Sequence, residues 1–285
     1  MEGLQAEVLK VAVAEKRHIE LDVVVHDSID STNNWCLEQH KEGRDLPFAC
    51  FSEEQTSGKG RRGKHWVGTA NSNLAMSVVW RFVLPEQPLH LLPLSIAIAI
   101  VQTLEYFGLQ QVEIKWPNDV YVQGKKIAGI LIETQPVRSK AKSVNKDASV
   151  AVVVGVGLNY DMSQFGVSEQ KEIMVLTDLC EQFVMQDIHS LPTRQQVASM
   201  LLVNVVSVCQ NFQQFVDTYF ELFSTRYDYC KGKNVEIILD DNVSLSGVAL
   251  GINEKAELTV MIEGKLQVFN SAEVSVTAMS GKNSS

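Results

Sequence analysis

The feature that most constrains the fold is the apolar run SVAVVVGVGLN at residues 149–159. Its apolar residues follow one another without the polar alternation of a strand that has one face in water. A run of this kind is typical of a strand at the centre of a sheet, buried on both faces. We therefore expect a β-sheet built around residues 149–159, with other strands on either side.

Several other segments have the pattern of a strand or of a helix. Residues 123–124, Gln-Gly, predict a tight hairpin turn. Two of the helix patterns begin at an N-cap residue or a proline and end at a glycine. A third pattern, long and amphipathic, lies in the second half of the chain. Strands are expected at 20–27, 47–55, 73–83, 112–116, 119–122 and 125–133, and helices at 31–43, 88–107 and 193–226.

The character of the sequence changes after Cys230. Five short segments with β-rich composition follow one another, separated by turn residues at regular spacing. This pattern predicts a small all-β barrel. We therefore divide the chain into a tail or short helix at 1–19, a larger domain at 20–229 and a small β domain at 230–285.

Composition excludes several classes of protein. The chain has 285 residues and a formal net charge of −9, which argues against a general nucleic-acid binder and requires any basic site to be local. The five cysteines are scattered and the histidines form no metal-binding spacing, so we expect reduced thiols and no structural zinc. The N-terminus does not read as a signal peptide, and the run at 91–101 is too short to span a membrane. A cytoplasmic protein is expected.

The stretch GKGRRG at 58–63 matches the spacing of a dinucleotide-binding loop but lacks its context. No helical periodicity follows it, and no acidic residue stands where the ribose would need one. A Walker A reading fails as well, because His65 occupies the position of the hydroxyl that binds Mg²⁺. The stretch is then either a solvated charged turn or a glycine-rich lid that closes over an anion. Its cations are Lys59, Arg61, Arg62 and Lys64.

Three further stretches carry unusual combinations of residues. In KWPNDV at 115–120, a turn accounts for Pro-Asn-Asp but not for the adjacent Lys115 and Trp116. In KKIAGILIE at 125–133, the glycine within a strand indicates close approach of a ligand or another backbone. In GVGLN at 155–159, a buried strand ends on Gly-Val-Gly and a polar Asn.

Taken in order, DSIDSTNNW, SEEQTSGKGRRGKHW, KWPNDV, KKIAGILIE and GVGLN resemble the biotin protein ligases. The resemblance runs from about residue 24 to the end of the chain. It implies an α/β (α+β) fold, with a mixed β-sheet packed by helices in the catalytic domain and an SH3-like barrel after it. It also implies an ATP-dependent ligase that activates biotin as biotinyl-5′-AMP and transfers it to a lysine of a biotin carboxyl carrier domain.

The resemblance assigns roles to individual positions. Catalysis would involve Lys126, Arg61, Lys59 and Asp119, and Asp119 would also face Mg²⁺ or the incoming lysine. Biotin would be bound by Ser31, Thr32, Asn33, Gln55, Gly58, Lys59, Gly60, Arg61, Trp66, Lys126 and Gly129. ATP would be bound by Arg61, Arg62, Lys64, Trp66, Lys115, Asn118, Lys126 and Asn159.

The chain departs from the family pattern at three places. Lys59 stands where the family often has Arg, which keeps the charge but loses the bidentate fork. Residues 173–177, IMVLT, offer Met174 where some members have a Trp against adenine. About 20 residues precede the first expected strand, too few for the winged helix-turn-helix of many bacterial members, so no repressor function is expected.

The resemblance also implies the substrates and partners. ATP with Mg²⁺ and biotin are expected as substrates, and no tightly bound redox cofactor. The expected partner is a carboxylase carrier domain, with no DNA and no membrane, and a homodimer is left open. Two alternatives remain at this stage: a lipoate-attaching enzyme of the same superfamily, and a biotin-responsive regulator without important catalysis.

Overall fold

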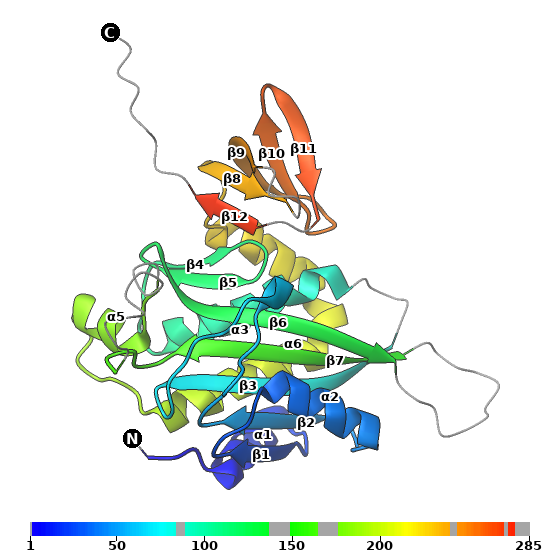
Figure 1. The fold of residues 1–285 in the computed structure, drawn as a ribbon, viewed down its shortest axis with the longest axis vertical. Helices are drawn as coiled ribbons and strands as arrows, with labels where there is room; N and C mark the ends of the chain where they lie inside the picture. The colour runs from blue at the N-terminus through cyan, green and yellow to red at the C-terminus, as the bar shows by residue number, and fades with distance from the viewer. Residues whose placement is uncertain are drawn as a thin grey trace, which may run out of the picture.

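The protein contains two β-sheets, a large mixed sheet packed by helices and a small antiparallel sheet (Figure 1). A computed structural model describes residues 2–83, 89–136, 149–164, 176–239, 244–270 and 273–276. The predicted fold class is confirmed by this arrangement. The loop at 138–148 and Met174, both singled out in the sequence, lie outside the described residues.

The large sheet has seven strands in the order β1-β2-β3-β7-β6-β5-β4. Its apolar run forms β7 in the middle of the sheet, as predicted, between β3 and β6. β1 and β2 are parallel and the other neighbours antiparallel, so the sheet is mixed. The strands are β1 (Asp22–His26), β2 (Phe48–Ser52), β3 (Asn73–Val83), β4 (Val112–Lys115), β5 (Asp119–Val122), β6 (Lys125–Pro136) and β7 (Ser149–Asn159).

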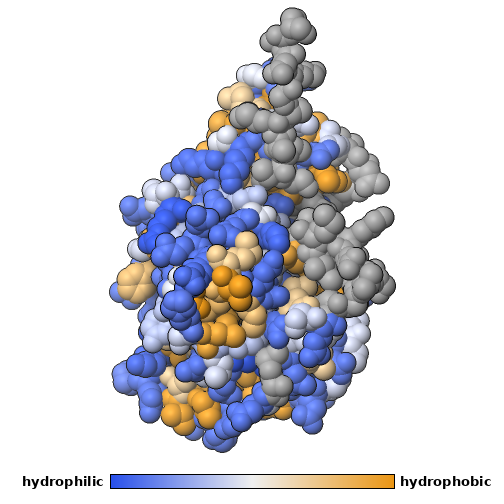
Figure 2. Space-filling model, turned by 90° about the vertical axis from the view of Figure 1, so that its left-hand side faces the viewer, coloured by the Kyte–Doolittle hydropathy of each residue, from blue (hydrophilic) through white to orange (hydrophobic). Residues whose placement is uncertain are grey.

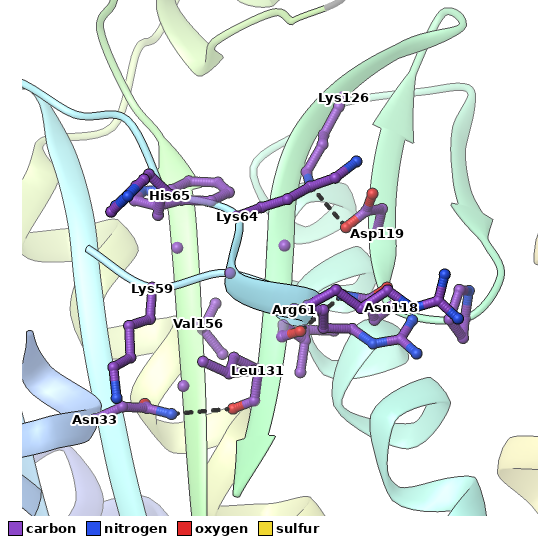
Figure 3. A pocket seen from close by; sticks show the side chains of 18 of the residues that line it. Asn33, Lys59, Arg61, Lys64, His65, Asn118, Asp119, Lys126, Leu131 and Val156 are labelled. Atoms are coloured by element: carbon purple, nitrogen blue, oxygen red, sulfur yellow. Dashed lines mark hydrogen bonds and ion pairs between the residues drawn. The ribbon is translucent and has the colours of Figure 1, made fainter. Parts of the chain in front are cut away.

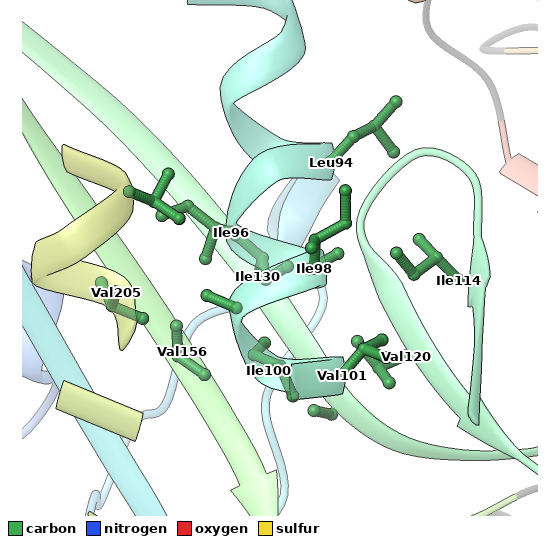
Figure 4. Packing of buried hydrophobic residues seen from close by; sticks show 14 of the residues in the cluster. Leu94, Ile96, Ile98, Ile100, Val101, Ile114, Val120, Ile130, Val156 and Val205 are labelled. Atoms are coloured by element: carbon green, nitrogen blue, oxygen red, sulfur yellow. The ribbon is translucent and has the colours of Figure 1, made fainter. Parts of the chain in front are cut away.

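Helices α3 (Leu92–Tyr106) and α6 (Arg194–Leu222) pack together behind the sheet, and α2 (Thr32–Glu42) contacts β2, β3 and β7 (Figure 1). α3 is buried around most of its circumference because it lies between the sheet and α6, as Figure 4 shows. α1 (Ala6–Arg17) packs on α6. The sequence did not predict α5 (Leu179–Met185), although Asp178 caps it by accepting from the amide of Glu181.

Short irregular elements connect some of the helices and strands. A 3-10 turn, η2 (Leu89–Leu91), leads into α3, and a π-helical turn, η4 (Phe223–Tyr227), follows α6. The hairpin between β5 and β6 has positive φ angles at Gln123 and Gly124, the geometry that a two-residue type I′ turn requires. That predicted hairpin is therefore confirmed.

The second sheet has five antiparallel strands in the order β11-β10-β9-β8-β12. Its inner face is apolar, with Val235, Ile237, Leu258 and Val260 buried. The five predicted strands are confirmed, while the domain boundary at residue 230 stays a prediction. The strands are β8 (Asn234–Ile238), β9 (Ser244–Ile252), β10 (Leu258–Ile262), β11 (Lys265–Phe269) and β12 (Glu273–Val276).

Trp116 joins the two sheets. Its indole Nε1 donates to the carbonyl oxygen of Ala256 at 2.8 Å, and the side chain is 2% exposed. Ala256 lies between β9 and β10, 140 residues away along the chain. The turn in KWPNDV therefore carries a tryptophan that anchors the small sheet beside the large one.

Trp116→Phe is expected to lower the melting temperature by several degrees, because it leaves the buried Ala256 carbonyl without its donor at a cost of about 1–3 kcal/mol. Thermal unfolding followed by calorimetry measures this. Trp80→Phe, on β3, is the control for the loss of indole volume away from the contact. Equal shifts for the two variants would contradict the anchoring role.

One helical stretch, Leu89–Tyr106, is long and apolar enough to cross a membrane, and 67% of that window is buried inside the protein. It contains α3, which is the central core helix (Figure 4). The face in Figure 2 is mainly hydrophilic, with apolar side chains gathered in separate clusters.

All five cysteines are free, and four are buried, which agrees with the prediction of reduced thiols.

Candidate functional site

A cavity of 390 Å³ collects nearly all of the predicted site residues. Its walls come from the start of α2, the loop at 58–66, the β4–β5 turn and strands β6 and β7 (Figure 3). The predicted residues that line it are Ser31, Thr32, Asn33, Gln55, Lys59, Gly60, Arg61, Arg62, Lys64, Trp66, Lys115, Asn118, Asp119, Lys126 and Gly129. Segments far apart in the sequence thus form one site.

One end of the cavity is a network of neutral polar side chains. Gln55 Oε1 accepts from the amide of Thr32 at 2.8 Å and from its hydroxyl at 3.1 Å. Ser77 Oγ lies 2.7 Å from Thr32 Oγ1 and 2.6 Å from Asn33 Oδ1, and its single proton can serve either one. Thr32, Asn33 and Ser77 are buried, so these bonds are made away from bulk water.

A tryptophan covers the middle of the cavity. An added Cβ at Gly157 would lie 2.4 Å from Trp66 Cε2, and one at Gly129 would lie 3.0 Å from Trp66 Cζ3. The Trp66 ring therefore rests directly on the backbone of β6 and β7. Lys126 Nζ is 5.5 Å from the ring centroid, within cation–π range. This stretch of the wall is apolar and flat.

The glycine-rich loop is a closed backbone structure. Gly60 donates its amide to the Lys64 carbonyl at 2.7 Å, and Trp66 donates to the Gly58 carbonyl at 2.9 Å. A 3-10 turn, Arg61–Gly63, forms the tip, with Arg62 at φ 53° and Gly63 at φ 73°. In Figure 3 the Lys59 side chain extends toward Asn33, away from Lys126.

The other end of the cavity is cationic. Lys126 Nζ pairs with Asp119 Oδ1 at 2.8 Å, and Arg61 Nη1 donates to Asn118 Oδ1 at 3.1 Å (Figure 3). Burial and then the charge of Arg62 lower the pKa of the Arg61 guanidinium, while Asp119 partly opposes them. Cations held this close together and away from water favour binding of an anion.

Lys115 reaches this end through Tyr121. Its Nζ donates to Tyr121 Oη at 3.1 Å, and burial followed by the charge of Asp119 raises the pKa of that hydroxyl. The phenol therefore stays protonated at neutral pH. Tyr121 in turn stacks on Tyr229, with centroids 5.0 Å apart, so the linker to the small sheet supports this wall.

The donor set for a metal is small. No group of three or more His, Cys, Asp or Glu side chains that could hold a metal lies among the described residues. Asp119 is one carboxylate, and it is paired with Lys126. Mg²⁺ bound with nucleotides commonly uses one or two carboxylates together with phosphate oxygens. Asp119 fits such a role only with the phosphates present.

Two predicted residues do not line the cavity. Asn159 is 1% exposed, and its Nδ2 donates to the carbonyl oxygen of Thr177 at 3.0 Å, which ties β7 to the segment before α5. Gly58 is not a lining residue, and an added Cβ there would be 2.7 Å from the Trp66 carbonyl oxygen. Their predicted contacts with ATP and biotin stay predictions.

The sequence did not single out Ser77 or give separate roles to Gly155 and Gly157. An added Cβ at Gly155 would lie 2.2 Å from Asn33 Oδ1, so both glycines make room for site side chains. The glycine spacing in GVGLN was the available signal for the two glycines. Ser77 is a fully buried polar residue between apolar neighbours in β3.

The comparison that decides the family covers the part of the chain that builds this cavity. The model described as "Biotin/lipoate A/B protein ligase family" matches residues 25–159. Residues 25–159 belong to this family. This match, together with the relatives and the solved structure described next, confirms the resemblance to biotin protein ligases and the ligase class of the chain.

Relatives that match most of the chain agree with this result. The chain is 28% identical over 278 residues to "Bifunctional ligase/repressor BirA" of Salmonella typhimurium, covering 95% of this chain and 80% of that protein. It is also 28% identical over 260 residues to "Biotin--[acetyl-CoA-carboxylase] ligase" of Mycobacterium tuberculosis, covering 90% and 88%. These relatives extend the ligase-family similarity past residue 159.

A solved structure shares the fold. The biotin protein ligase from Aquifex aeolicus in complex with biotin and ATP superposes with a TM-score of 0.67 at 22% identity. The match covers 90% of this chain and 99% of that one. The two-sheet architecture is therefore common to this chain and a ligase of the family.

Proposed function

We propose that the chain activates biotin with ATP to form biotinyl-5′-AMP and transfers the biotinyl group to a lysine of a biotin carboxyl carrier domain. The observation that carries the proposal is the polarity of the cavity. Neutral hydrogen-bonding groups gather around Thr32 and Ser77, an apolar wall around Trp66, and cations around Lys126. Biotin has a neutral ureido ring, an apolar middle and a carboxylate in the same order.

In the first step a biotin carboxylate oxygen attacks the α-phosphorus of ATP, and the bond from that phosphorus to pyrophosphate breaks. Two anions must approach each other, so fixed positive charge stabilises the transition state. Lys126, Arg61 and Lys115 would supply it, with Lys64 from the loop and Lys59 once its side chain turns away from Asn33 (Figure 3). Mg²⁺, held by Asp119 and phosphate oxygens, would neutralise charge on the phosphates.

In the second step a lysine amine of the carrier domain attacks the acyl carbon, and the bond to AMP breaks. A free lysine has a pKa of about 10.4 and must lose a proton before it attacks. Asp119 would orient the ammonium or accept that proton, since release from Lys126 would free its carboxylate. The loop at 58–66 would shield the mixed anhydride from water between the steps.

The remaining roles stay proposals of the same kind. Ser31, Thr32, Asn33 and Gln55 would hold the ureido ring, and Asn118 would help to bind ATP beside Arg61. We expect a carboxylase carrier domain as the protein partner and the cytoplasm as the compartment. The absence of DNA and membrane partners, and the choice between monomer and homodimer, stay predictions.

The test is transfer of labelled biotin to a purified biotin carboxyl carrier domain in the presence of ATP and Mg²⁺. Incorporation that requires ATP and the acceptor lysine supports the proposal. Lipoate offered in place of biotin tests the alternative within the family, and specific binding to an operator fragment in a gel shift tests the regulator. Lipoate transfer without biotin transfer would overturn the proposal.

Ser77→Ala is expected to raise the KM for biotin about tenfold, because a buried network loses a donor worth about 1–2 kcal/mol. The kcat should change little, since Ser77 lies away from Lys126. Steady-state pyrophosphate release measures both. Ser95→Ala is the matched control: Ser95 is also fully buried and donates one hydrogen bond, to Leu91 O at 3.0 Å within α3. A KM that rises equally in both variants would contradict the role of Ser77.

A further inference from the structure

Glu133 bonds to a predicted biotin-binding residue without lining the cavity itself. Asn33 Nδ2 donates to Glu133 Oε2 at 2.8 Å, across 100 residues of sequence. The same nitrogen makes a second, longer hydrogen bond of 3.4 Å to the carbonyl oxygen of Leu131 (Figure 3). Glu133 is thus the main acceptor for the amino group of Asn33.

This bond determines which way the Asn33 amide points. A carboxylate only accepts, so it selects the NH₂ side of the amide. Asn33 Oδ1 is then turned to the opposite side, where Ser77 Oγ lies 2.6 Å away and the oxygen occupies the place that a side chain at Gly155 would fill. An acceptor oxygen therefore faces Gly155, which is part of the cavity wall.

The Gln55 amide has a fixed direction as well. Its Oε1 accepts both bonds from Thr32, so its Nε2 must point elsewhere, and it lies toward Gly58. Gln55 and Asn33 both line the polar end of the cavity, so its wall contains one amide donor and one amide acceptor, each of fixed direction. A ureido group has the complementary pair, a carbonyl oxygen and N–H groups, whereas a dithiolane ring has neither.

We propose that Glu133 is a positioning residue that determines specificity for a ureido ligand by fixing the orientation of the Asn33 amide. This inference rests on the proposed function. Glu133 does not line the cavity and would act only through Asn33. Its contribution is the acceptor it presents, since a group that donated instead would turn the Asn33 oxygen away from the cavity.

Three substitutions test this by biotin titration in a calorimeter. Glu133→Gln keeps an acceptor and is expected to bind biotin within about threefold of the wild type. Glu133→Ala removes the acceptor and should weaken binding about tenfold. Glu133→Lys supplies a donor that reverses the amide and should weaken binding further, by about a hundredfold. At saturating biotin, kcat and the KM for ATP should stay near those of the wild type in all three variants.

The controls separate positioning from charge and from folding. Glu42→Lys makes the same charge reversal at the exposed end of α2 and should leave biotin binding unchanged. Gln and Ala variants that bind equally weakly would overturn the inference, because the charge and not the acceptor would then matter. Wild-type affinity in Glu133→Lys would overturn it as well. A wild-type protein that binds no biotin would overturn the proposed function and the inference together, whereas failure confined to the variants overturns only the inference.

Discussion

Lys126→Ala is expected to lower biotin-dependent pyrophosphate release by about 10²–10³-fold while the protein stays folded. Lys126 Nζ pairs with Asp119 and lies over Trp66, where the cationic end of the cavity meets its apolar middle. In the proposed reaction the biotin carboxylate and the α-phosphate meet at this place. Removing the ammonium leaves two approaching anions beside the Asp119 carboxylate, so the transition state loses stabilisation and gains repulsion.

The neighbouring lysine is a close control for this change. Lys125 pairs with Glu181 of α5 at 3.1 Å and does not line the cavity, so Lys125→Ala removes one charge from the same strand at another face. Its pyrophosphate release should stay within about twofold of the wild type, since exposed ion pairs contribute at most about 1 kcal/mol. Near-normal release by Lys126→Ala, or equal losses in both variants, would contradict the role of Lys126.

Gly157→Ala is expected to weaken biotin binding about a hundredfold, with a loss of stability of about 1–3 kcal/mol. The new methyl group would lie 2.4–2.8 Å from three ring atoms of Trp66. β7 is the central strand and cannot move away, so the ring must leave its place on the sheet. That shift would carry the loop at 58–66 with it, because Trp66 and Gly58 are joined by a backbone hydrogen bond.

A double-mutant cycle with Trp66→Leu tests the cause. If the collision with Trp66 accounts for the loss, Gly157→Ala should cost little more in the Trp66→Leu background, since the ring is already gone. Isothermal titration with biotin gives the four affinities, and thermal unfolding gives the stabilities. Additive losses in the two single variants would show that Gly157 acts independently of Trp66.

The sequence alone determined much of the local structure. β3 and β7 begin and end where the sequence predicted, because long apolar runs end sharply at polar or turn residues. The sequence alone also identified the cations of the loop at 58–66 and the residues of KWPNDV as candidate site residues. The sequence did not predict the short helix α5, because its few residues show no helical periodicity that would distinguish them from a loop.

The tertiary structure decided which of these residues meet. The period of a strand shows which side chains share a face, but not which side chain lies opposite them on another element. Ser77 therefore meets Thr32 and Asn33 only because α2 packs on β3. Asn159 bonds to Thr177 and does not line the cavity. Glu133 and Asn33, 100 residues apart, and Trp116 and Ala256, 140 residues apart, become partners only in the folded chain. The sequence determined which functional groups the site contains, and packing between distant elements decided how these groups are oriented toward one another.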